Sequence, residues 1–297
     1  MEIIERCPIC QNDKFEVAFE TQDYFLTNEQ FTIVNCSACG FRFTNPRPEP
    51  EKLSEYYKSE EYISHSNTKK GFVNKIYHFV RNHGHKSKYA LINKFQKNGK
   101  SILDIGCATG EFLNFFKEKG WNVLGIEPGT NARKFAEENY KLDVYDEEKL
   151  GKLSDNSFDV VTMWHVLEHV PKLNERILEL KRIVKDEGIL VIAVPNCNSY
   201  DAVFYQKFWA AYDVPRHLYH FSTDTLKMLF KKHELSIIKI APMKFDSFYV
   251  SLLSEKYKSK KPSFVKAFFR GILSNLKSGK NTDYSSVIFV VKKSKVF

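Results

Sequence analysis

Short apolar runs alternate with amphipathic segments along most of the chain after residue 100. The runs expected to form buried strands lie at residues 101–105, 122–127, 142–145, 158–164 and 188–195. Between them, apolar residues three or four positions apart predict helices at 111–119, 130–139 and 168–185. Such alternation predicts βαβ units and a parallel sheet with helices on both faces. A helix at 223–233 and two more apolar runs, at 235–243 and 285–293, complete this α/β region.

The first hundred residues are organised differently. Residues 1–44 contain short β-like runs between polar turns, which suits a small unit that cannot fold on its apolar core alone. The proline-rich stretch Asn45–Pro50 predicts a stiff linker that separates this unit from the rest. Residues 51–95 have helical apolar spacing with an interruption near His83–His85. We therefore predict a small unit at 1–44, a linker and helical segment at 45–100, and an α/β domain at 101–297 with an insertion at about 244–284.

The composition is that of a soluble globular protein, with 43% hydrophobic and 27% charged residues. No apolar run approaches the roughly 20 residues that cross a bilayer, and the chain begins with acidic residues and cysteines where a signal peptide needs an apolar stretch. We expect a cytoplasmic protein. The net charge of +9 comes from an excess of Lys and Arg in residues 62–100 and 251–297. This excess favours an anionic partner, although solvated helix faces would give the same pattern.

Four of the six cysteines form two C-x2-C pairs, Cys7 with Cys10 and Cys36 with Cys39. In a chain without an export signal, this spacing predicts one structural zinc held by four thiolates, as in a zinc ribbon. Gly40 supplies the turn that such pairs favour. Redox or disulfide chemistry and a catalytic metal are the alternatives for the same residues.

The first strand of the α/β region runs into a glycine turn with the pattern D-x-G-x-x-x-G, formed by Asp104, Gly106 and Gly110. A turn between a strand and a helix lets a ligand lie against backbone N–H groups. The third glycine of the dinucleotide fingerprint is absent, so a ligand without a pyrophosphate fits better. Glu127, at the end of the next strand, is placed to accept both ribose hydroxyls of an adenosine-type ligand. The alternative is a structural turn beside a surface carboxylate.

These segments resemble those of the class I S-adenosylmethionine-dependent methyltransferases. The resemblance runs from residue 101 to about 297 and is carried by ILDIGCATG, GIEPG, SFDVVTMWHVLEHV and GILVIAVPN. It implies a Rossmann-like sheet of seven strands ending in an antiparallel hairpin, with S-adenosylmethionine as the cofactor. The residues that would surround its methionine moiety and ribose are Asp104, Gly106, Gly110 and Glu127. The adenine contact is expected just after the third strand, where Asp146 and Glu147 are candidates.

A second set of candidates, His165, Glu168 and His169, follows the fourth strand. Helical spacing would place them on one face at the carboxyl edge of the sheet, where α/β proteins bind ligands. For a hydroxyl acceptor, methyl transfer needs a base, a role that suits histidine. The same spacing could hold a divalent cation, and it resembles the metal sites of some ubiquinone-pathway and small-RNA O-methyltransferases. A structural cluster at a helix start is the third interpretation.

Residues 209–221, after the fifth strand, combine Trp, Tyr, Arg and His in a segment expected to be irregular. They resemble the DxPRHxxxFS stretch of small-molecule and sugar methyltransferases that carry N-terminal zinc modules. We predict a wall of the substrate site, with His217 as a second candidate base. A loop stabilised by its own polar contacts is the alternative.

Between the two final strands, apolar residues at 264, 265, 268, 269, 272, 273 and 276 recur at helical spacing with basic residues beside them. This pattern predicts a helix with an apolar face bordered by positive charge, suited to an anionic membrane surface and peripheral membrane association. A helix whose apolar face packs on the domain or caps the site is the alternative.

These features predict an N-terminal zinc ribbon joined to a methyltransferase that acts on the oxygen of a small-molecule acceptor, such as a sugar, nucleotide-sugar or lipid-linked glycan. An RNA methyltransferase, with nucleic acid as the partner of the basic segments, is one alternative. Most of the basic residues are Lys rather than Arg, which disfavours it. A non-catalytic zinc-ribbon scaffold is the other alternative.

Overall fold

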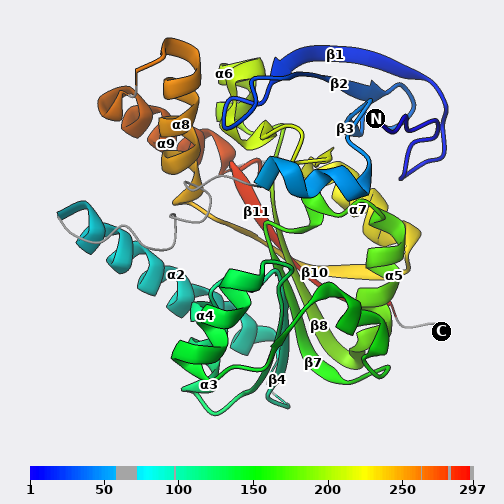
Figure 1. Ribbon diagram of the computed structural model, residues 1–297, viewed down its shortest axis with the longest axis vertical. Helices are drawn as coiled ribbons and strands as arrows, with labels where there is room; N and C mark the ends of the chain where they lie inside the picture. The colour runs from blue at the N-terminus through cyan, green and yellow to red at the C-terminus, as the bar shows by residue number, and fades with distance from the viewer. Residues whose placement is uncertain (58–71, 97, 262, 280–281, 295–297) are drawn as a thin grey trace.

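The computed structural model describes residues 1–57, 72–96, 98–261, 263–279 and 282–294. Two sheets organise them (Figure 1). A seven-stranded sheet runs through the middle and lower part of the view, and a four-stranded sheet lies at the top beside the N-terminus.

The larger sheet contains β4 (Ser101–Ile105), β5 (Asn122–Ile126), β6 (Val144–Tyr145), β7 (Phe158–Trp164), β8 (Val184–Pro195), β10 (Leu235–Pro242) and β11 (Ser286–Lys293). Their order across the sheet is β10-β11-β8-β7-β4-β5-β6. From β6 to β8 all neighbours are parallel, whereas β11 runs antiparallel to both β8 and β10. The predicted Rossmann-like sheet with a terminal antiparallel hairpin is therefore confirmed.

Helices cover both faces of this sheet because its strands carry apolar residues on both sides. The α-helices are α2 (Phe72–Phe95), α3 (Glu111–Lys117), α4 (Thr130–Tyr140), α5 (Leu173–Ile183), α6 (Tyr200–Tyr205), α7 (Thr223–Lys232), α8 (Asp246–Ser259) and α9 (Phe264–Ser278). Short 3₁₀ helices are η1 (Pro50–Tyr57), η2 (Glu147–Lys152), η3 (Leu167–His169), η4 (Gln206–Phe208) and η5 (Ala210–Tyr212). Along β4, Leu103 and Ile105 join the core under α5 and α7, whereas Ile102 joins the core under α2, α3 and α4 (Figure 1).

The smaller sheet joins the N-terminal unit to the α/β region. Its strands β1 (Phe15–Gln22), β2 (Gln30–Cys36) and β3 (Arg42–Thr44) are antiparallel, and β3 pairs with β9 (Tyr219–His220) from the α/β region. The ring centroid of Phe41 lies 5.8 Å from that of Tyr219 and 5.4 Å from that of Phe221. The domain boundaries at 44 and 100 remain a prediction, but the linker does not keep the N-terminal unit apart.

Two helix predictions need correction. α2 continues through His83–His85, because one glycine inside a helix costs only about 1 kcal/mol. The helix predicted at 168–185 is instead the 3₁₀ turn η3, a bend at Pro171 and then α5, because proline lacks the N–H group that a continuous helix needs. His165, Glu168 and His169 therefore do not share one α-helical face.

The insertion between β10 and β11 forms two helices, α8 and α9, which pack against each other. The predicted amphipathic helix is α9, and residues 262, 280 and 281 of the predicted insertion lie outside the described residues. Among the helices that the structure describes, none is both long enough and apolar enough to cross a membrane.

Candidate active site

The glycine turn lies between β4 and α3, as predicted. Gly106 and Gly110 have φ angles of 74° and 82°, a conformation that side chains rarely adopt. A Cβ atom at Gly106 would lie 2.4 Å from Cγ2 of Val166, and one at Gly110 would lie 2.6 Å from Cδ1 of Leu142. Both the backbone path and the close approach of neighbouring side chains therefore require glycine.

Glu127, just after β5, is tied to this turn. One carboxylate oxygen accepts a hydrogen bond from the N–H of Ala108 at 2.9 Å, and the other accepts one from the N–H of Gly129 at 2.8 Å. Burial raises the pKa of Glu127, and the two N–H groups oppose that shift. The carboxylate is thereby held beside the turn, where the ribose of the predicted cofactor is expected.

Asp104 supports the turn from inside the protein. It is 2% exposed, and it accepts a hydrogen bond of 2.5 Å from the hydroxyl of Thr162. Burial raises the pKa of Asp104 to about 7, although Thr162 and the ammonium of Lys88 favour the carboxylate. Its contact with a methionine moiety remains a prediction.

The two adenine candidates differ in their surroundings. Asp146 is exposed directly after β6, a position that fits the predicted contact. Glu147 instead forms an ion pair with Arg176. The role of Asp146 remains a prediction.

His165 leaves the same edge of the large sheet as Gly106, because β4 and β7 are parallel neighbours. Its Nε2 lies 3.0 Å from a carboxylate oxygen of Asp246, and its Nδ1 lies 3.4 Å from one of Glu168. Burial lowers the pKa of His165, but the two carboxylates outweigh burial and raise it to about 10. A protonated imidazole cannot accept a proton, so this geometry disfavours His165 as the base.

Glu168, His169 and His217 form a second cluster at this edge, with one ligand atom from each lying within 4.8 Å of the others. Glu168 is fully buried, and neither of its carboxylate oxygens has a hydrogen-bond partner among the described residues. Nδ1 of His169 lies 3.0 Å from the carbonyl oxygen of Arg216, and Nδ1 of His217 lies 2.8 Å from that of Ala211. A carbonyl only accepts, and the hydroxyl oxygen of Tyr57, 2.8 Å from Nδ1 of His169, can accept as well, so we assign the proton to each Nδ1, which leaves a lone pair on each Nε2.

This cluster can perform two kinds of chemistry. Burial and the neighbouring His217 lower the pKa of His169 to about 4, so the imidazole of His169 is neutral at pH 7 and has a lone pair to accept a proton. Two Nε2 atoms and a carboxylate are also a donor set that suits a divalent transition metal. Hydrogen bonds from Nδ1 to carbonyl groups are common behind metal-bound histidines. The residues therefore fit a divalent cation as well.

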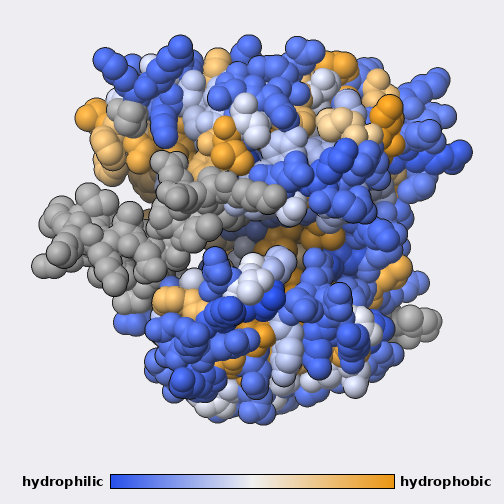
Figure 2. All heavy atoms as spheres, viewed as in Figure 1, coloured by the Kyte–Doolittle hydropathy of each residue, from blue (hydrophilic) through white to orange (hydrophobic). Residues whose placement is uncertain are grey.

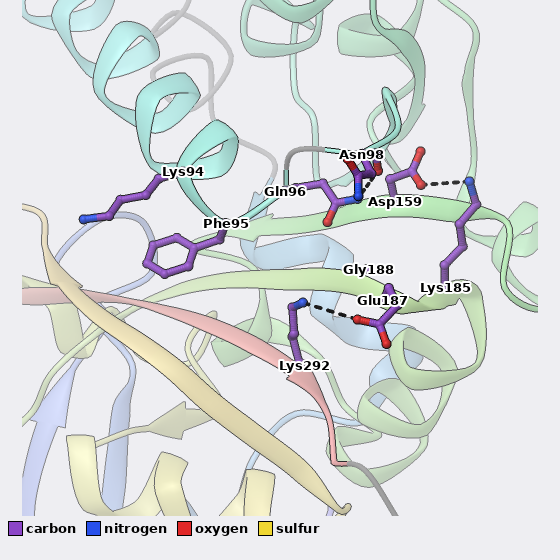
Figure 3. Close-up of a pocket in the computed structure, with 9 residues that line it drawn as sticks. All are labelled: Lys94, Phe95, Gln96, Asn98, Asp159, Lys185, Glu187, Gly188 and Lys292. Carbon is purple, nitrogen blue, oxygen red and sulfur yellow. Dashed lines mark hydrogen bonds and ion pairs between the residues drawn. The ribbon is translucent and has the colours of Figure 1, made fainter.

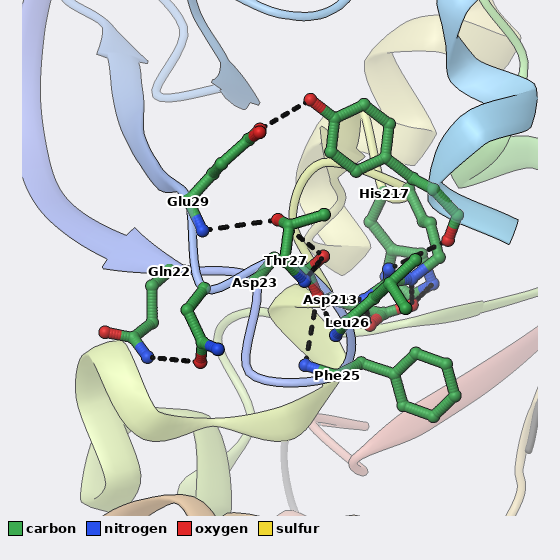
Figure 4. A network of polar contacts seen from close by, with 11 residues as sticks. Gln22, Asp23, Phe25, Leu26, Thr27, Glu29, Asp213 and His217 are labelled. Carbon is green, nitrogen blue, oxygen red and sulfur yellow. Dashed lines mark hydrogen bonds and ion pairs between the residues drawn. The ribbon is translucent and has the colours of Figure 1, made fainter. Parts of the chain in front are cut away.

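The aromatic segment 209–221 is mostly buried rather than an open substrate wall, which corrects that prediction. Arg216 is 1% exposed and bridges Asp213, at 2.6 Å, and Asp23 in the loop between β1 and β2, at 2.8 Å. Figure 4 shows the two aspartates within one network of polar contacts. The indole N–H of Trp209 donates to Asp201 at 2.7 Å. Two members of the segment meet Glu168: His217 through its imidazole, and Leu218 through a backbone N–H that donates to the carbonyl of Glu168 at 2.8 Å. The segment thus links the N-terminal sheet to the candidate site.

The four paired cysteines come together at one end of the N-terminal sheet. The Sγ atoms of Cys7 and Cys39 lie 3.6 Å apart, and those of Cys10 and Cys36 lie 3.5 Å apart. These separations exceed the roughly 2.0 Å of a disulfide and approach the edge of about 3.8 Å of a tetrahedron with Zn–S bonds near 2.3 Å. Burial opposes ionisation of Cys36, but the N–H groups of Cys39 and Ala38 outweigh it and lower the pKa of Cys36 to about 7. The cluster fits one zinc ion.

A surface pocket lies at the opposite edge of the large sheet (Figure 3). Four of its five charged residues pair with one another: Lys185 lies 2.8 Å from Asp159, and Lys292 lies 3.8 Å from Glu187. At the carboxyl edge, Figure 2 shows the surface hollowed between the N-terminal sheet and the part that carries α3 and α4. The pocket lies at the amino ends of β7 and β8, whereas the glycine turn follows the carboxyl end of β4, so the pocket is not part of the candidate site.

Comparison with known proteins agrees with this geometry. A family model described as a methyltransferase domain matches residues 79–240, more than half of the 297-residue chain. The chain belongs to the class I S-adenosylmethionine-dependent methyltransferases. The predicted family is therefore confirmed.

Among curated relatives, this methyltransferase is 34% identical over 109 residues to the ubiquinone biosynthesis O-methyltransferase of Glaesserella parasuis, covering 33% of this chain and 46% of that protein. It is 30% identical over 162 residues to an uncharacterized protein of Methanocaldococcus jannaschii, covering 51% of this chain and 68% of that protein. The chain thus spans about half the length of the ubiquinone-pathway relatives that it matches.

A solved structure shows the same fold. The crystal structure of the Burkholderia thailandensis 1,6-didemethyltoxoflavin-N1-methyltransferase, with 1,6-didemethyltoxoflavin and S-adenosylhomocysteine bound, has a TM-score of 0.51 at 11% identity. The match covers 93% of this chain and 100% of that one.

Three residues at the site of this methyltransferase escape prediction from sequence. Tyr57 places its hydroxyl 2.8 Å from Nδ1 of His169, and Asp246 bonds His165. Lys88 lies 3.8 Å above the ring of Trp164, although its basic segment predicts a surface position. None of the three lies in a sequence motif. Their contacts join segments far apart in the chain, so no local pattern marks them.

Proposed function

We propose that this protein transfers a methyl group from S-adenosylmethionine to a hydroxyl oxygen of a small-molecule acceptor, with a sugar or a lipid-linked compound as the acceptor class. The observation that carries the proposal is the cluster of Glu168, His169 and His217 at the same sheet edge as the glycine turn. Relatives named ubiquinone biosynthesis O-methyltransferases support oxygen as the acceptor atom.

The residues divide the work between binding and proton transfer. When bound, S-adenosylmethionine supplies an activated methyl group. Gly106 and Gly110 hold the turn between β4 and α3 in its left-handed path beside the ligand, and Glu127 accepts hydrogen bonds from the ribose hydroxyls. Nε2 of His169 or His217 takes the proton of the acceptor hydroxyl as the oxygen attacks, and the buried carboxylate of Glu168 stabilises the imidazolium so formed.

The test replaces each histidine in turn and follows labelled methyl groups into small molecules of a cell extract. His169→Ala or His217→Ala, whichever removes the base, should lower turnover by about 10²- to 10⁴-fold with cofactor affinity nearly unchanged. His233→Ala is the matched control, because His233 is buried but bonds Asn174 away from the cluster. Normal turnover in both site variants would exclude a histidine base.

A divalent cation is the second candidate role for this cluster, favoured by Oε2 of Glu168, a buried oxygen that has neither a hydrogen bond nor an ion pair among the described residues. Glu168, His169 and His217 would hold it, and it would orient the acceptor hydroxyl and lower the pKa of that group. In that case a chelator should abolish turnover while the cysteine cluster keeps its zinc, and added divalent metal should restore it. Full activity after chelation would assign the cluster to proton transfer.

We also propose that Cys7, Cys10, Cys36 and Cys39 hold one structural zinc ion. The two Sγ–Sγ separations of 3.6 and 3.5 Å and the gathering of all four sulfur atoms within 4.8 Å of one another support this assignment. The ion would stabilise a unit whose own core is small.

A further inference from the structure

The helices α8 and α9 present an unusual surface, because α9 packs through its small residues. Ala267, Gly271, Ser274 and Ser278 are buried. A Cβ at Gly271 would lie 2.6 Å from the ring of Phe248, and Ser274 donates a hydrogen bond of 2.7 Å to Asp201. The face of α9 that packs against the protein therefore consists of small residues, two of which are polar.

The apolar face of α9 points outward instead. Phe264 is 71% exposed and Leu276 is 72% exposed, and the other exposed apolar residues of this helix are Val265, Phe268, Phe269 and Leu273. Phe245 and Tyr249, at the start of α8, extend the patch. Figure 2 shows apolar side chains gathered at the upper left, over these two helices. The interpretation that the apolar face packs on the domain is therefore wrong for most of its residues.

The charges around this patch are of one sign. The exposed charged side chains between residues 246 and 279 are Lys256, Lys258, Lys260, Lys261, Lys266 and Lys277. The two acidic residues of the same stretch are engaged within the protein: Asp246 pairs with His165, and Glu255 is buried and accepts a hydrogen bond from Tyr205. A second copy of the chain would bring like charges together, so charge complementarity favours an anionic partner.

We propose that α9 and the N-terminal end of α8, which carries Phe245 and Tyr249, dock on an anionic lipid bilayer. The exposed Phe and Leu side chains enter the boundary between head groups and acyl chains, and the lysines meet lipid phosphates. A bilayer supplies both an apolar layer and negative charge next to it, which matches the two features of this surface.

Docking would also place the candidate site near the membrane. Asp246, the first residue of α8, lies 3.0 Å from His165, so the helical pair is anchored at the edge of the site. A lipid-linked acceptor could then enter without leaving the bilayer surface. This last consequence rests on the proposed function, whereas the docking itself does not.

The test is sedimentation of the full chain with vesicles of phosphatidylcholine alone and of phosphatidylcholine mixed with phosphatidylglycerol. We expect binding to the mixed vesicles, weaker at high salt because salt screens the lysines. The double variant Phe268→Asp/Phe269→Asp should lose this binding. Leu178→Asp is the matched control, since Leu178 is 53% exposed on α5, and it should bind as the unaltered chain does.

Circular dichroism and binding of S-adenosylhomocysteine show that the variants are folded. Absence of binding to the mixed vesicles at any salt would overturn the proposal. So would self-association of the unaltered chain that the double variant abolishes without vesicle binding, because the patch would then be an interface between copies. Neither result depends on methyl transfer, so failure here is distinguishable from failure of the proposed function.

Discussion

At the scale of single residues, Gly106 combines two separate constraints. Its φ of 74° disfavours a side chain, and a Cβ there would collide with Val166. Gly120 is the matched control, because its φ is 76° but a Cβ atom added there would have no neighbouring atom within 4 Å. We expect Gly120→Ala to cost about 1 kcal/mol of folding free energy and Gly106→Ala clearly more, with loss of cofactor binding.

Thermal unfolding and calorimetry with S-adenosylhomocysteine measure the two effects. Equal stability and equal affinity in the two variants would show that the contact with Val166 does not matter. The glycine turn could be predicted because all its residues lie within seven positions at the end of a strand, so spacing alone identifies it. The contact between His217 and Glu168 could not be predicted from the sequence, because it depends on how two distant segments pack.

At the scale of elements, the loop between β1 and β2 is held to the α/β region by Asp23. Its carboxylate accepts hydrogen bonds from the N–H groups of Phe25, Leu26 and Thr27 and from the guanidinium of Arg216 (Figure 4). Both Asp23 and Arg216 are almost fully buried. Arg216 would keep its pair with Asp213, so Asp23→Asn removes one of two buried carboxylates from the guanidinium and should lower the free energy of unfolding by about 1.5–3 kcal/mol at pH 7.

The loss of stability in Asp23→Asn should become smaller as the pH falls. Burial raises the pKa of Asp23, but Arg216 outweighs burial and lowers it below the ordinary value. The stabilisation is therefore complete above about pH 5 and is lost as the pH falls through the lowered pKa. Denaturant unfolding at pH 7 and at about pH 3 measures it, and the difference between the two proteins should shrink at the lower pH.

Asp155→Asn provides the comparison for this pair. Asp155 also pairs with an arginine, Arg182, at 2.7 Å, but its side chain is 70% exposed. An exposed pair contributes about 1 kcal/mol or less. A cost for Asp23→Asn no larger than that for Asp155→Asn would contradict the role of the buried pair.

The elements that sequence predicts poorly are those whose signal is not local. The strands and helices of the α/β region follow from apolar periodicity, whereas β9 has two residues and exists because Tyr219 and His220 pair with β3. Pro171 is a local signal for the end of a helix, and it explains why the predicted helix at 168–185 is divided. The position of α9 in the chain could be predicted from its apolar spacing. That its apolar face is exposed could not, because it follows from the packing of the opposite face, with Ser274 and Gly271, against the protein.

At the scale of the whole molecule, the N-terminal unit and the α/β region share a sheet and a core. Cys7, Cys36 and Phe43 belong to the same buried cluster as Leu103 and Phe230. Cys36→Ser should therefore release zinc and lower the stability of the whole protein, with cofactor affinity reduced as well. A linker that kept the two parts separate would instead leave cofactor binding by the α/β region unchanged.

Elemental analysis and thermal unfolding check this prediction. We expect about one equivalent of zinc in the unaltered chain and a single unfolding transition, shifted down by at least about 5 °C in the variant. Cys197→Ser, at a buried cysteine outside the cluster, should keep its zinc. Full zinc retention in Cys36→Ser would contradict the assignment, and an early transition limited to the N-terminal unit would contradict the shared core.

The most direct test of the account is calorimetric titration of S-adenosylhomocysteine into the unaltered chain, Glu127→Ala and the control Glu234→Ala. Glu234 is an exposed residue paired with Lys181, away from the glycine turn. We predict one site per chain, a loss of about 1.5–3 kcal/mol of binding free energy in Glu127→Ala, and no change in the control. Unchanged affinity in Glu127→Ala, or no binding to the unaltered chain, would contradict the assignment of this edge of the sheet as the cofactor site.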